Sequence, residues 1–460
     1  MLKALLLERI LNEALATGAD FAEVFCEESR RSQLSMVNGE LEKALSGLDS
    51  GLGLRLWKGE MCLYTFSNDL SEAALLELTR LTAAALQGDR EARAETLKMQ
   101  EHVSSHPFDV RPGLVDKPGK VKKLRDASDS ARAYDPLITQ TRTGLTELET
   151  QVLIANSEGL LTEDERIYSR FSLEAVASSE SEKQTGFVAP GVRRGYEWFN
   201  TLDSNALATD AARTAVTMLK ADVCPSGQMP VIIENGFGGV IFHEACGHSL
   251  EATALAKNAS VFQDKMNQRI ASPIVNAIDD ATLAHEWGSR DIDDEGTPTQ
   301  KIVLIQDGIL KSYMVDRHNG RKLGLASTGS ARRESYRYAP TSRMSNTFIA
   351  AGKDDPKDII KSTPYGLYAK SMGGGSVDPA SGEFNFSVQE AYLIKDGEVT
   401  QPVRGATLIG KGADILMKID KVGNNLKMSQ GMCGSVSGSV PANVGQPMIR
   451  VSQMTVGGRK

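Results

Sequence analysis

The stretch Met229–Leu255, MPVIIENGFGGVIFHEACGHSLEATAL, concentrates more potential chemistry than any other part of the 460-residue sequence. It opens with an apolar run, residues 231–233, that is typical of a buried strand. A glycine-rich turn follows, and the apolar spacing after that turn predicts a helix. His243, Glu244 and His248, which are residue types that bind and use a metal ion, lie on this helix. We therefore expect the fold to be organised around this strand, turn and helix.

The two histidines are spaced as HExxxH, one residue more than the HExxH of familiar zinc proteases. Side chains at i and i+4 lie within about 40° on a helix face, whereas those at i and i+5 are about 140° apart. The helix must therefore be kinked if His243 and His248 bind one ion. Gly247 is the expected position of the kink, because glycine weakens a helix and tolerates unusual dihedral angles. On spacing alone, an ordinary amphipathic helix with two neighbouring histidines stays open.

A catalytic zinc site needs a third protein ligand and leaves one position for water. Cys246 follows His243 by three residues and falls on roughly the same helical face. Cys433 lies in a Gly- and Ser-rich segment, expected to be a loop before a last strand at 448–454. The simpler interpretation of Cys246 is a small buried apolar side chain. Residue chemistry alone leaves both cysteines open as the third ligand.

Composition restricts the class of protein. The 41% apolar and 24% charged residues are typical of a soluble globular protein. A net charge of −7 argues against a nucleic-acid partner. Glu8 and Arg9 interrupt the first apolar run, which indicates an amphipathic helix rather than a signal peptide, and no apolar stretch is long enough to span a membrane. Five scattered cysteines fit a reducing compartment, so we expect a cytoplasmic protein without a membrane partner.

The pattern predicts an α+β fold with two regions. Residues 1–222 form an N-terminal α+β region with a polar linker at about 88–123, and residues 223–460 form a β-rich C-terminal domain built around the kinked helix. The boundary is expected within 220–228. The expected N-terminal elements are a helix ending at Gly18, strands at 21–36, 41–45, 52–56 (half-buried) and 61–66, helices at 73–86 and 118–133, strands at 137–141, 147–156 and 170–178, and a helix at 205–219. Asp-Gly pairs predict C-terminal hairpins within 302–315 and 384–403.

Two charged segments outside the helix need an interpretation. Asp291–Gly296 resembles the start of a calcium loop, but the twelfth position is Ile302 rather than a glutamate. We expect a solvated acidic turn there. Residues 332–338 interleave arginines with tyrosines. In an acidic protein, ion pairs within the fold or contacts to a peptide are a better expectation than single-stranded nucleic acid.

The motif HEACGHSLEA after a strand and a Gly-rich turn resembles the metal motif of the TldD/PmbA family, cytoplasmic metallopeptidases also labelled modulators of DNA gyrase. The similarity covers nearly the whole chain. Further similar stretches are IDDATLAHEWGSRDIDDEGTPTQKIVLIQDG, STGSARRESYRYAPTSRMSNTFI and MCGSVSGSVPANVGQPMIRVSQMTVGG.

The resemblance implies that His243, His248 and Cys433 bind one zinc ion per chain and that Glu244 is the general base. The implied activity is hydrolysis of peptide bonds in small peptides or unfolded segments, with Glu-assisted attack of zinc-bound water. The family pairs a metal-binding subunit with a paralogue that lacks HExxxH, so a dimer with such a paralogue or with a second copy is expected. Cys246 departs from the family, which more often has a small non-thiol residue there.

Two other functions remain open from the sequence. A non-enzymatic regulator of a DNA enzyme or toxin system would need no zinc and would be insensitive to Glu244→Gln. A cysteine-dependent amidase would use Cys433 or Cys246 with a histidine, and thiol alkylation would abolish its activity while a chelator would not.

Overall fold

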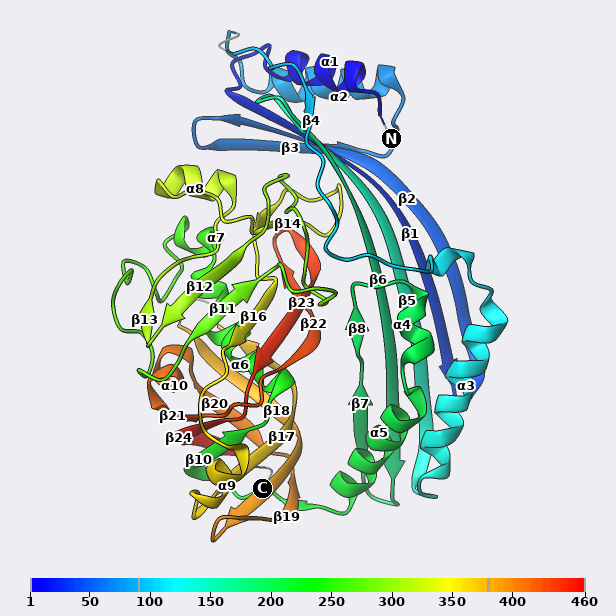
Figure 1. The fold of residues 1–460 in the computed structure, drawn as a ribbon, viewed down its shortest axis with the longest axis vertical. Helices are drawn as coiled ribbons and strands as arrows, with labels where there is room; N and C mark the ends of the chain where they lie inside the picture. The colour runs from blue at the N-terminus through cyan, green and yellow to red at the C-terminus, as the bar shows by residue number, and fades with distance from the viewer. Residues whose placement is uncertain (1, 90–91, 379–380, 459–460) are drawn as a thin grey trace.

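One strongly curved sheet forms the first half of the chain in the computed structural model, which describes residues 2–89, 92–378 and 381–458 (Figure 1). The bounds of its strands are Phe21–Val37 (β1), Glu40–Lys58 (β2), Met61–Ser67 (β3), Lys98–Met99 (β4), Ile138–Asn156 (β5), Leu160–Ser178 (β6), Lys183–Val188 (β7) and Gly191–Val192 (β8). The strand order is β3-β2-β1-β5-β6-β4, and β7 and β8 also pair with β6. Neighbours along this order run antiparallel, apart from the short parallel pair of β4 with β6.

The strands of this sheet are longer than the sequence predicts. Asn38 and Gly39 both have positive φ, 51° and 81°, and form the predicted tight turn between β1 and β2. However, residues 41–45 and 52–56 belong to one strand, β2, and residues 137–141 and 147–156 belong to one strand, β5. Those separations were wrong because the polar residues and glycines between the segments stay paired with β1, which residues 46–51 of β2 and 142–146 of β5 continue to face.

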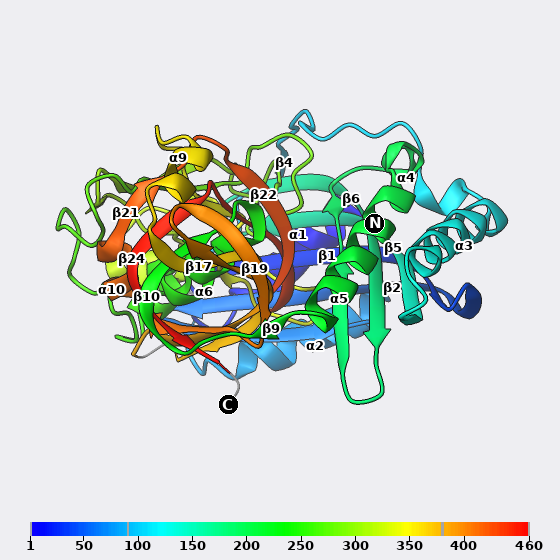
Figure 2. The same ribbon diagram turned by 90° about the horizontal axis from the view of Figure 1, so that it is seen from below.

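Helices cover the convex face of the curved sheet in two places. The bounds of the N-terminal helices are Ala4–Ala14 (α1), Glu72–Ala84 (α2), the 3₁₀ turn Pro112–Leu114 (η1), Lys117–Ala133 (α3), Tyr196–Thr201 (α4) and Ser204–Leu219 (α5). Apolar side chains of α1 and α2 pack on β1 and β2, and those of α3 and α5 pack on β5 and β6. Figure 2 shows α3 and α5 side by side on this second part of the sheet. The predicted helices are confirmed, and because α3 begins at Lys117 the linker ends earlier than expected; residues 90–91 of the linker lie outside the described residues.

The prediction that 52–56 is half-buried was wrong, because both faces of this part of β2 are covered. Leu52, Leu54 and Leu56 face the α1–α2 core, while Arg55, only 1% exposed, faces the second half of the chain. A Cβ on Gly53 would lie 2.7 Å from the carbonyl oxygen of Tyr336. Glycine at this position therefore lets the second half approach the strand closely.

The second half contains two larger sheets and one short one. The eight strands of the first are Asp222–Val223 (β9), Gly227–Ile233 (β10), Tyr365–Val377 (β17), Glu383–Lys395 (β18), Glu398–Arg404 (β19), Thr407–Lys411 (β20), Ile419–Val422 (β21) and Ile449–Gly457 (β24). The six of the second are Ala277–Asp280 (β11), Lys301–Gln306 (β12), Ile309–Leu310 (β13), Asn346–Ile349 (β16), Lys427–Ser435 (β22) and Gly438–Gln446 (β23), and Ala331–Arg332 (β14) pairs with Thr341–Ser342 (β15). Both Asp-Gly hairpins are confirmed, as β12–β13 and β18–β19.

The eight-stranded sheet closes on itself. Its order is β17-β10-β24-β20-β18-β19-β9, and β17 also pairs with β18, so β17, β10, β24, β20 and β18 form a closed barrel. The six-stranded sheet, in the order β13-β12-β11-β16-β23-β22, lies beside it and ends in the edge strand β22. Because barrel closure removes the free edges of those strands, β22 offers one of the few open sheet edges in this half.

Short helices occupy the space between and around these sheets. Their bounds are Gly236–Gly239 (η2, 3₁₀), Val240–Ala245 (α6), Gly247–Leu250 (η3, 3₁₀), Ala252–Leu255 (α7), Arg317–Leu323 (α8), Pro356–Lys361 (α9) and Gly412–Lys418 (α10). The helix α6 contacts β17 and β18 of one sheet and β16 and β23 of the other (Figure 1). The sequence thus predicts the β-rich second half and its central helix correctly; the domain boundary within 220–228 stays a prediction. None of the described helices combines the length and apolar character needed to cross a bilayer.

Charged side chains join the two halves. Arg55 of β2 contacts Glu23 and Glu295 at 2.7 Å each, and Arg333 contacts Glu23 at 2.8 Å. Arg166 of β6 contacts Asp294 at 2.6 Å. These six side chains form the inter-half ion cluster: Glu23, Arg55, Arg166, Asp294, Glu295 and Arg333.

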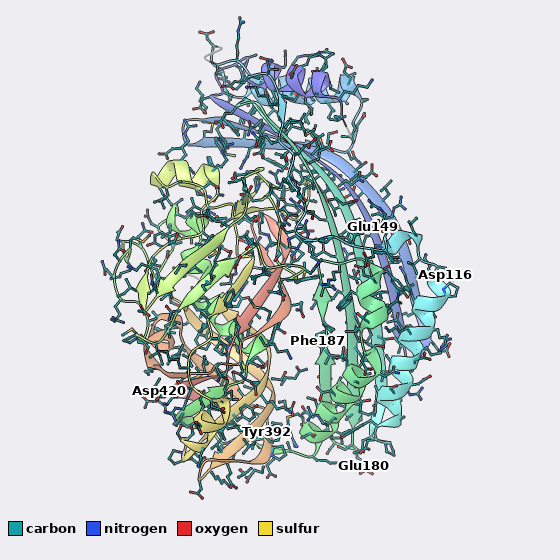
Figure 3. All side chains as sticks on the ribbon, viewed as in Figure 1. Asp116, Glu149, Glu180, Phe187, Tyr392 and Asp420 are labelled. Carbon is teal, nitrogen blue, oxygen red and sulfur yellow. The ribbon has the colours of Figure 1, made fainter. Side chains whose placement is uncertain are left out.

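The solvated acidic turn at 291–296 is therefore a wrong prediction. Asp294 and Glu295 are at most 1% exposed, because they lie between the halves and accept hydrogen bonds from arginines of both. The expectation of ion pairs for residues 332–338 is confirmed by Arg333 and by the Arg337–Asp49 pair. A second ion pair joins the two halves, between Arg213 of α5 and Glu390 of β18. The hydroxyl group of Tyr392 (Figure 3) donates a hydrogen bond to the same Glu390 carboxylate.

Candidate metal centre

The predicted strand, turn and helix form, and the helix is interrupted as HExxxH requires. β10 ends at Ile233, η2 makes the turn, and α6 ends at Ala245. Cys246 leaves the helical region with φ −129° and ψ −45°, and the chain continues as the 3₁₀ turn η3. The kink thus lies at Cys246, one residue before the expected position. Gly247 instead leaves room for the side chain of Met344, because a Cβ at this position would lie 2.2 Å from the Met344 sulfur.

Cys433 lies in a strand, not in the expected loop. It belongs to β22 and pairs with Val440 of β23. The Gly- and Ser-rich composition concealed this hairpin because its inward positions on β23, Val440, Ala442 and Val444, are separated by a proline and an asparagine. The guanidinium of Arg343, 1% exposed, donates to the carbonyl oxygens of Cys433 and Gly438 and so fixes the hairpin that carries the thiol.

The break in the helix brings both histidines to this thiol. Nε2 of His243 lies 3.2 Å from Cys433 Sγ, and Nε2 of His248 lies 3.4 Å from it. The ring centroids of the histidines are 5.3 Å apart at an interplanar angle of 85°. One ligand atom from each of the three residues lies within 4.8 Å of the others. Two imidazoles and a thiolate are ligands that zinc accepts, and three protein ligands leave a position for water, so the donor set fits the ion.

The charges of the three residues favour ligation by sulfur. Burial opposes ionisation of Cys433, but the neighbouring imidazoles of His243 and His248 outweigh burial and hold the pKa of the thiol well below its usual range. Burial also disfavours the charged form of His248, but the Glu251 carboxylate and the Cys433 sulfur raise the pKa of this imidazole well above its usual range. The two imidazoles therefore favour the thiolate of Cys433, which is the form that binds metal.

The two glutamates near the histidines have different environments. The side chain of Glu244 is 32% exposed, and its Oε2 lies 3.8 Å from Nε2 of His248. The side chain of Glu251 is 4% exposed and lies on the other side of the same ring, with Oε2 3.2 Å from Nδ1. Glu244 is therefore accessible to a substrate, whereas Glu251 is not. Sequence reasoning missed Glu251; its position three residues after His248 was the available signal.

Cys246 is not among the converging residues. Its side chain is 2% exposed within the apolar core of the second half, and burial raises the pKa of its thiol far above the usual range. This environment supports the simpler interpretation, a small buried apolar side chain. Of the described residues, the three that converge are the ones implied by the family resemblance.

A second group of metal-ligand types also converges, at the junction of the two halves. Single ligand atoms of His102, Asp164 and Asp291 lie within 4.8 Å of one another. However, Asp164 already accepts from Arg166 at 2.6 Å and Arg193 at 3.4 Å, and Arg193 lies 3.6 Å from Asp291. The positive charge that these carboxylates need is supplied by guanidinium groups, so this group does not fit a metal ion.

Models of one protein family match three consecutive parts of the chain. They are the PmbA/TldA metallopeptidase domain 1 over residues 22–86, the central domain over 111–219 and the C-terminal domain over 226–458. The chain belongs to the PmbA/TldD metallopeptidase family. The resemblance predicted from the motifs is thereby confirmed.

Relatives in the PmbA/TldD family match from about half of the chain to nearly all of it. A metalloprotease TldD homologue from Haemophilus influenzae is 35% identical and covers 95% of this chain and 93% of its own. A zinc metalloprotease TldD homologue from Saccharolobus solfataricus is 31% identical over 56% of this chain and 58% of its own. The crystal structure of a Thermotoga maritima protein labelled a modulator of a DNA gyrase has the same fold, with a TM-score of 0.79 at 21% identity, and covers 95% of this chain and 96% of its own.

Proposed function

We propose that this protein is a zinc metallopeptidase that hydrolyses small peptides or unfolded segments. The observation that carries the proposal is the convergence of His243, His248 and Cys433 from segments 185 or more residues apart in sequence. Curated relatives named metalloproteases, one of them a zinc metalloprotease, support the activity at the level of the family.

In the proposed mechanism the three converging side chains would hold the zinc ion, and Glu244 would move the proton. When bound, the ion would lower the pKa of a water molecule and polarise the scissile carbonyl group. Glu244 is adjacent to a ligand and partly exposed, so its carboxylate is placed to accept a proton from the attacking water and to donate it to the leaving amine. Residues of β22 and η3 would keep the ligands in place while substrate binds.

An extended peptide is the expected form of the substrate. The edge strand β22, which carries Cys433, brings a sheet edge to the centre, and an added strand would bind through main-chain hydrogen bonds with little sequence preference. Two carbonyl groups of β22 already accept hydrogen bonds, that of Gly431 from Trp287 at 2.8 Å and that of Cys433 from Arg343. An added strand must therefore form its hydrogen bonds with other backbone groups of β22. Equal cleavage of folded proteins and unfolded peptides would contradict this expectation.

The glutamate substitution Glu244→Gln tests the enzymatic proposal. We expect the variant to keep the zinc content of the wild type, because Glu244 is not in the ligand set, and to lose about 10²–10⁴-fold in kcat on an unfolded peptide. Metal analysis and peptide-cleavage rates measured on the same samples check both parts. Wild-type rates in the variant, or a wild type without zinc, would contradict the proposal.

A cysteine-dependent amidase has one observation in its favour, the 3.2 Å contact between Cys433 and His243 that resembles a thiolate–imidazole pair. It predicts activity that survives chelation, whereas the zinc proposal predicts loss on chelation and recovery when zinc is added. A regulatory role is suggested by the gyrase label of the Thermotoga maritima protein. That role predicts no zinc requirement.

Partners and location remain predictions. We propose that the chain forms a dimer with a second copy or with a paralogue that lacks HExxxH, as the family resemblance implies. The cytoplasmic location is supported by the five cysteines, all of which are free thiols in the structure.

A further inference from the structure

The two histidines of the metal centre differ in the atoms that surround the second ring nitrogen. Nδ1 of His248 lies 3.2 Å from Oε2 of Glu251. Nδ1 of His243 is buried and has no hydrogen-bond partner among the described residues. Packing within the core is thus what orients His243, whereas a carboxylate is in contact with His248.

Glu251 is itself held firmly. Its residue is 3% exposed, and its second oxygen, Oε1, accepts from the backbone N–H of Met344 at 3.3 Å. Its backbone forms a bridge with Met314, and the flanking residues bond to the same segment, through Ala252 N to Met314 O at 2.8 Å and Met314 N to Leu250 O at 2.9 Å. The carboxylate therefore has one oxygen fixed by the backbone and the other directed at His248.

We infer that Glu251 is the positioning residue of the centre: it accepts the Nδ1–H of His248, so that the Nε2 lone pair of this ring is available to a metal ion beside Cys433. In the neutral form of the ring, which is the form that binds metal, a proton held on Nδ1 by an acceptor leaves Nε2 unprotonated and orients the ring plane. Nε2 is the atom that lies 3.4 Å from the sulfur, on the side of the ring away from Glu251. This inference rests on the proposed zinc peptidase and assigns no contact with substrate to Glu251.

The substitution Glu251→Gln separates this role from simple packing. Glu251 accepts from two donors, one with each oxygen, but a glutamine has only one acceptor oxygen and a donor NH₂ in place of the other. If the amide oxygen accepts from His248, the NH₂ group faces the N–H of Met344. If it accepts from Met344 instead, the NH₂ group donates to Nδ1 and places the ring proton on Nε2, which cannot then bind metal. The ligating form of His248 is therefore kept only in the first arrangement, where it costs the hydrogen bond of the Met344 N–H.

A matched control is the buried carboxylate that binds the backbone N–H of Ser345, the residue after Met344. Asp279 is 2% exposed and accepts from the backbone N–H of Ser345 at 2.8 Å, much as Glu251 accepts from Met344, but it bonds to Ser345 and Thr347 and not to a histidine of the centre. Asp279→Asn therefore removes a buried carboxylate of similar burial without altering a metal ligand. Glu251→Asp keeps both acceptor oxygens on a shorter side chain.

The measurement is the Kd for zinc of the full chain, from competition with a chromogenic chelator, together with the absorption spectrum of the Co²⁺-loaded protein and the unfolding temperature without metal. We expect Glu251→Gln to weaken zinc binding about 10–100-fold and to alter the cobalt spectrum, with Glu251→Asp in between. We expect Asp279→Asn to have the zinc Kd and the cobalt spectrum of the wild type, whatever its unfolding temperature.

The outcomes distinguish the two proposals. Wild-type zinc affinity in Glu251→Gln, or an equal loss of affinity in Asp279→Asn, would overturn the positioning role while leaving the zinc peptidase intact. A wild type that binds no zinc would overturn the proposed function and this inference with it. If Glu251→Gln is too unstable to purify, Glu251→Asp decides, because zinc affinity equal to the wild type from a displaced carboxylate would show that its position does not matter.

Discussion

The candidate metal centre and the inter-half ion cluster are both buried groups of ionisable side chains, but only the ion cluster contains guanidinium groups. In the ion cluster each carboxylate contacts at least one guanidinium, with Glu23 between Arg55 and Arg333 and Asp294 beside Arg166. In the metal centre no arginine or lysine forms an ion pair with a candidate ligand among the described residues. Among the described residues, the positive charge beside the Cys433 thiol and the Glu251 carboxylate comes from imidazoles, which are themselves metal ligands, rather than from guanidinium groups.

The same comparison separates the two candidate ligand groups. The ligand atoms of His102, Asp164 and Asp291, like those of His243, His248 and Cys433, lie within 4.8 Å of one another. Proximity alone therefore does not identify a metal site. The presence or absence of guanidinium partners does, and the following experiments test that distinction.

The largest expected effect belongs to the metal centre. Cys433→Ala removes the only thiolate of the converging set, so we expect loss of zinc from the purified protein and peptidase activity below detection. Cys246→Ala, at a buried cysteine of the same region, is expected to retain about one zinc per chain. Metal analysis of both variants decides, and zinc retained by Cys433→Ala would move the third ligand to another residue.

Removal of a cation from the ion cluster should affect stability and not metal. Arg55→Ala leaves Glu23 and Glu295 with less counter-charge in a buried site, and breaking such a pair costs about 3–5 kcal/mol in the free energy of unfolding. Urea unfolding followed by circular dichroism measures the loss, and zinc content should equal that of the wild type.

The control is Arg321→Ala, which breaks a second pair between the halves, with Asp20. Its side chains are 43% and 32% exposed, so the expected cost is about 0–1 kcal/mol. Equal losses in Arg55→Ala and Arg321→Ala would show that burial of the cluster does not govern its contribution.

A smaller effect is expected at the Arg213–Glu390 contact, and it depends on pH. Burial raises the pKa of Glu390, but hydrogen bonds from Arg213, Tyr392 and Lys370 outweigh burial and lower it to about 2 from an ordinary value of 4.5. An acid with a lowered pKa in the folded state contributes stability above its unfolded pKa and loses it as pH falls toward the folded value. Glu390→Gln should therefore destabilise by about 3 kcal/mol at pH 7, and the difference from the wild type should shrink between pH 4.5 and 2.

Unfolding midpoints in urea, measured across this pH range for the wild type and Glu390→Gln, check the prediction. A difference that stays constant with pH would mean that Glu390 acts through packing rather than through its charge.

The smallest effect, none on metal content, is expected for His102→Ala. Because Arg166 and Arg193 already neutralise Asp164, the variant should bind the same amount of zinc as the wild type, also with excess zinc in the buffer. A second zinc ion in the wild type that His102→Ala loses would show that guanidinium partners do not exclude a metal here.

The sequence was sufficient to predict most of the local elements. It was insufficient to predict which side chains are buried by distant parts of the chain. The HExxxH spacing predicted a broken helix if both histidines bind one ion, and the structure contains a break there. The sequence did not predict that Cys433 lies in a strand. Its Gly- and Ser-rich hairpin is stabilised by Arg343 and by neighbouring strands rather than by local propensity. The burial of Asp294 and Glu295 was missed for the same kind of reason, since their arginine partners lie up to 240 residues away. Glu251 was missed because only the fold places it against Nδ1 of His248.

The wide separation of the ligands has a consequence for the synthesis of the protein. His243 and His248 emerge from the ribosome long before Cys433, which lies 185 residues after His248 and near the end of the chain. A nascent or prematurely terminated chain without β22 therefore lacks the thiolate and has only a partial ligand set. On the proposed function, an enzyme that attacks unfolded polypeptide would acquire its hydrolytic centre only after Cys433 has been made, and this delay would protect incomplete copies from one another.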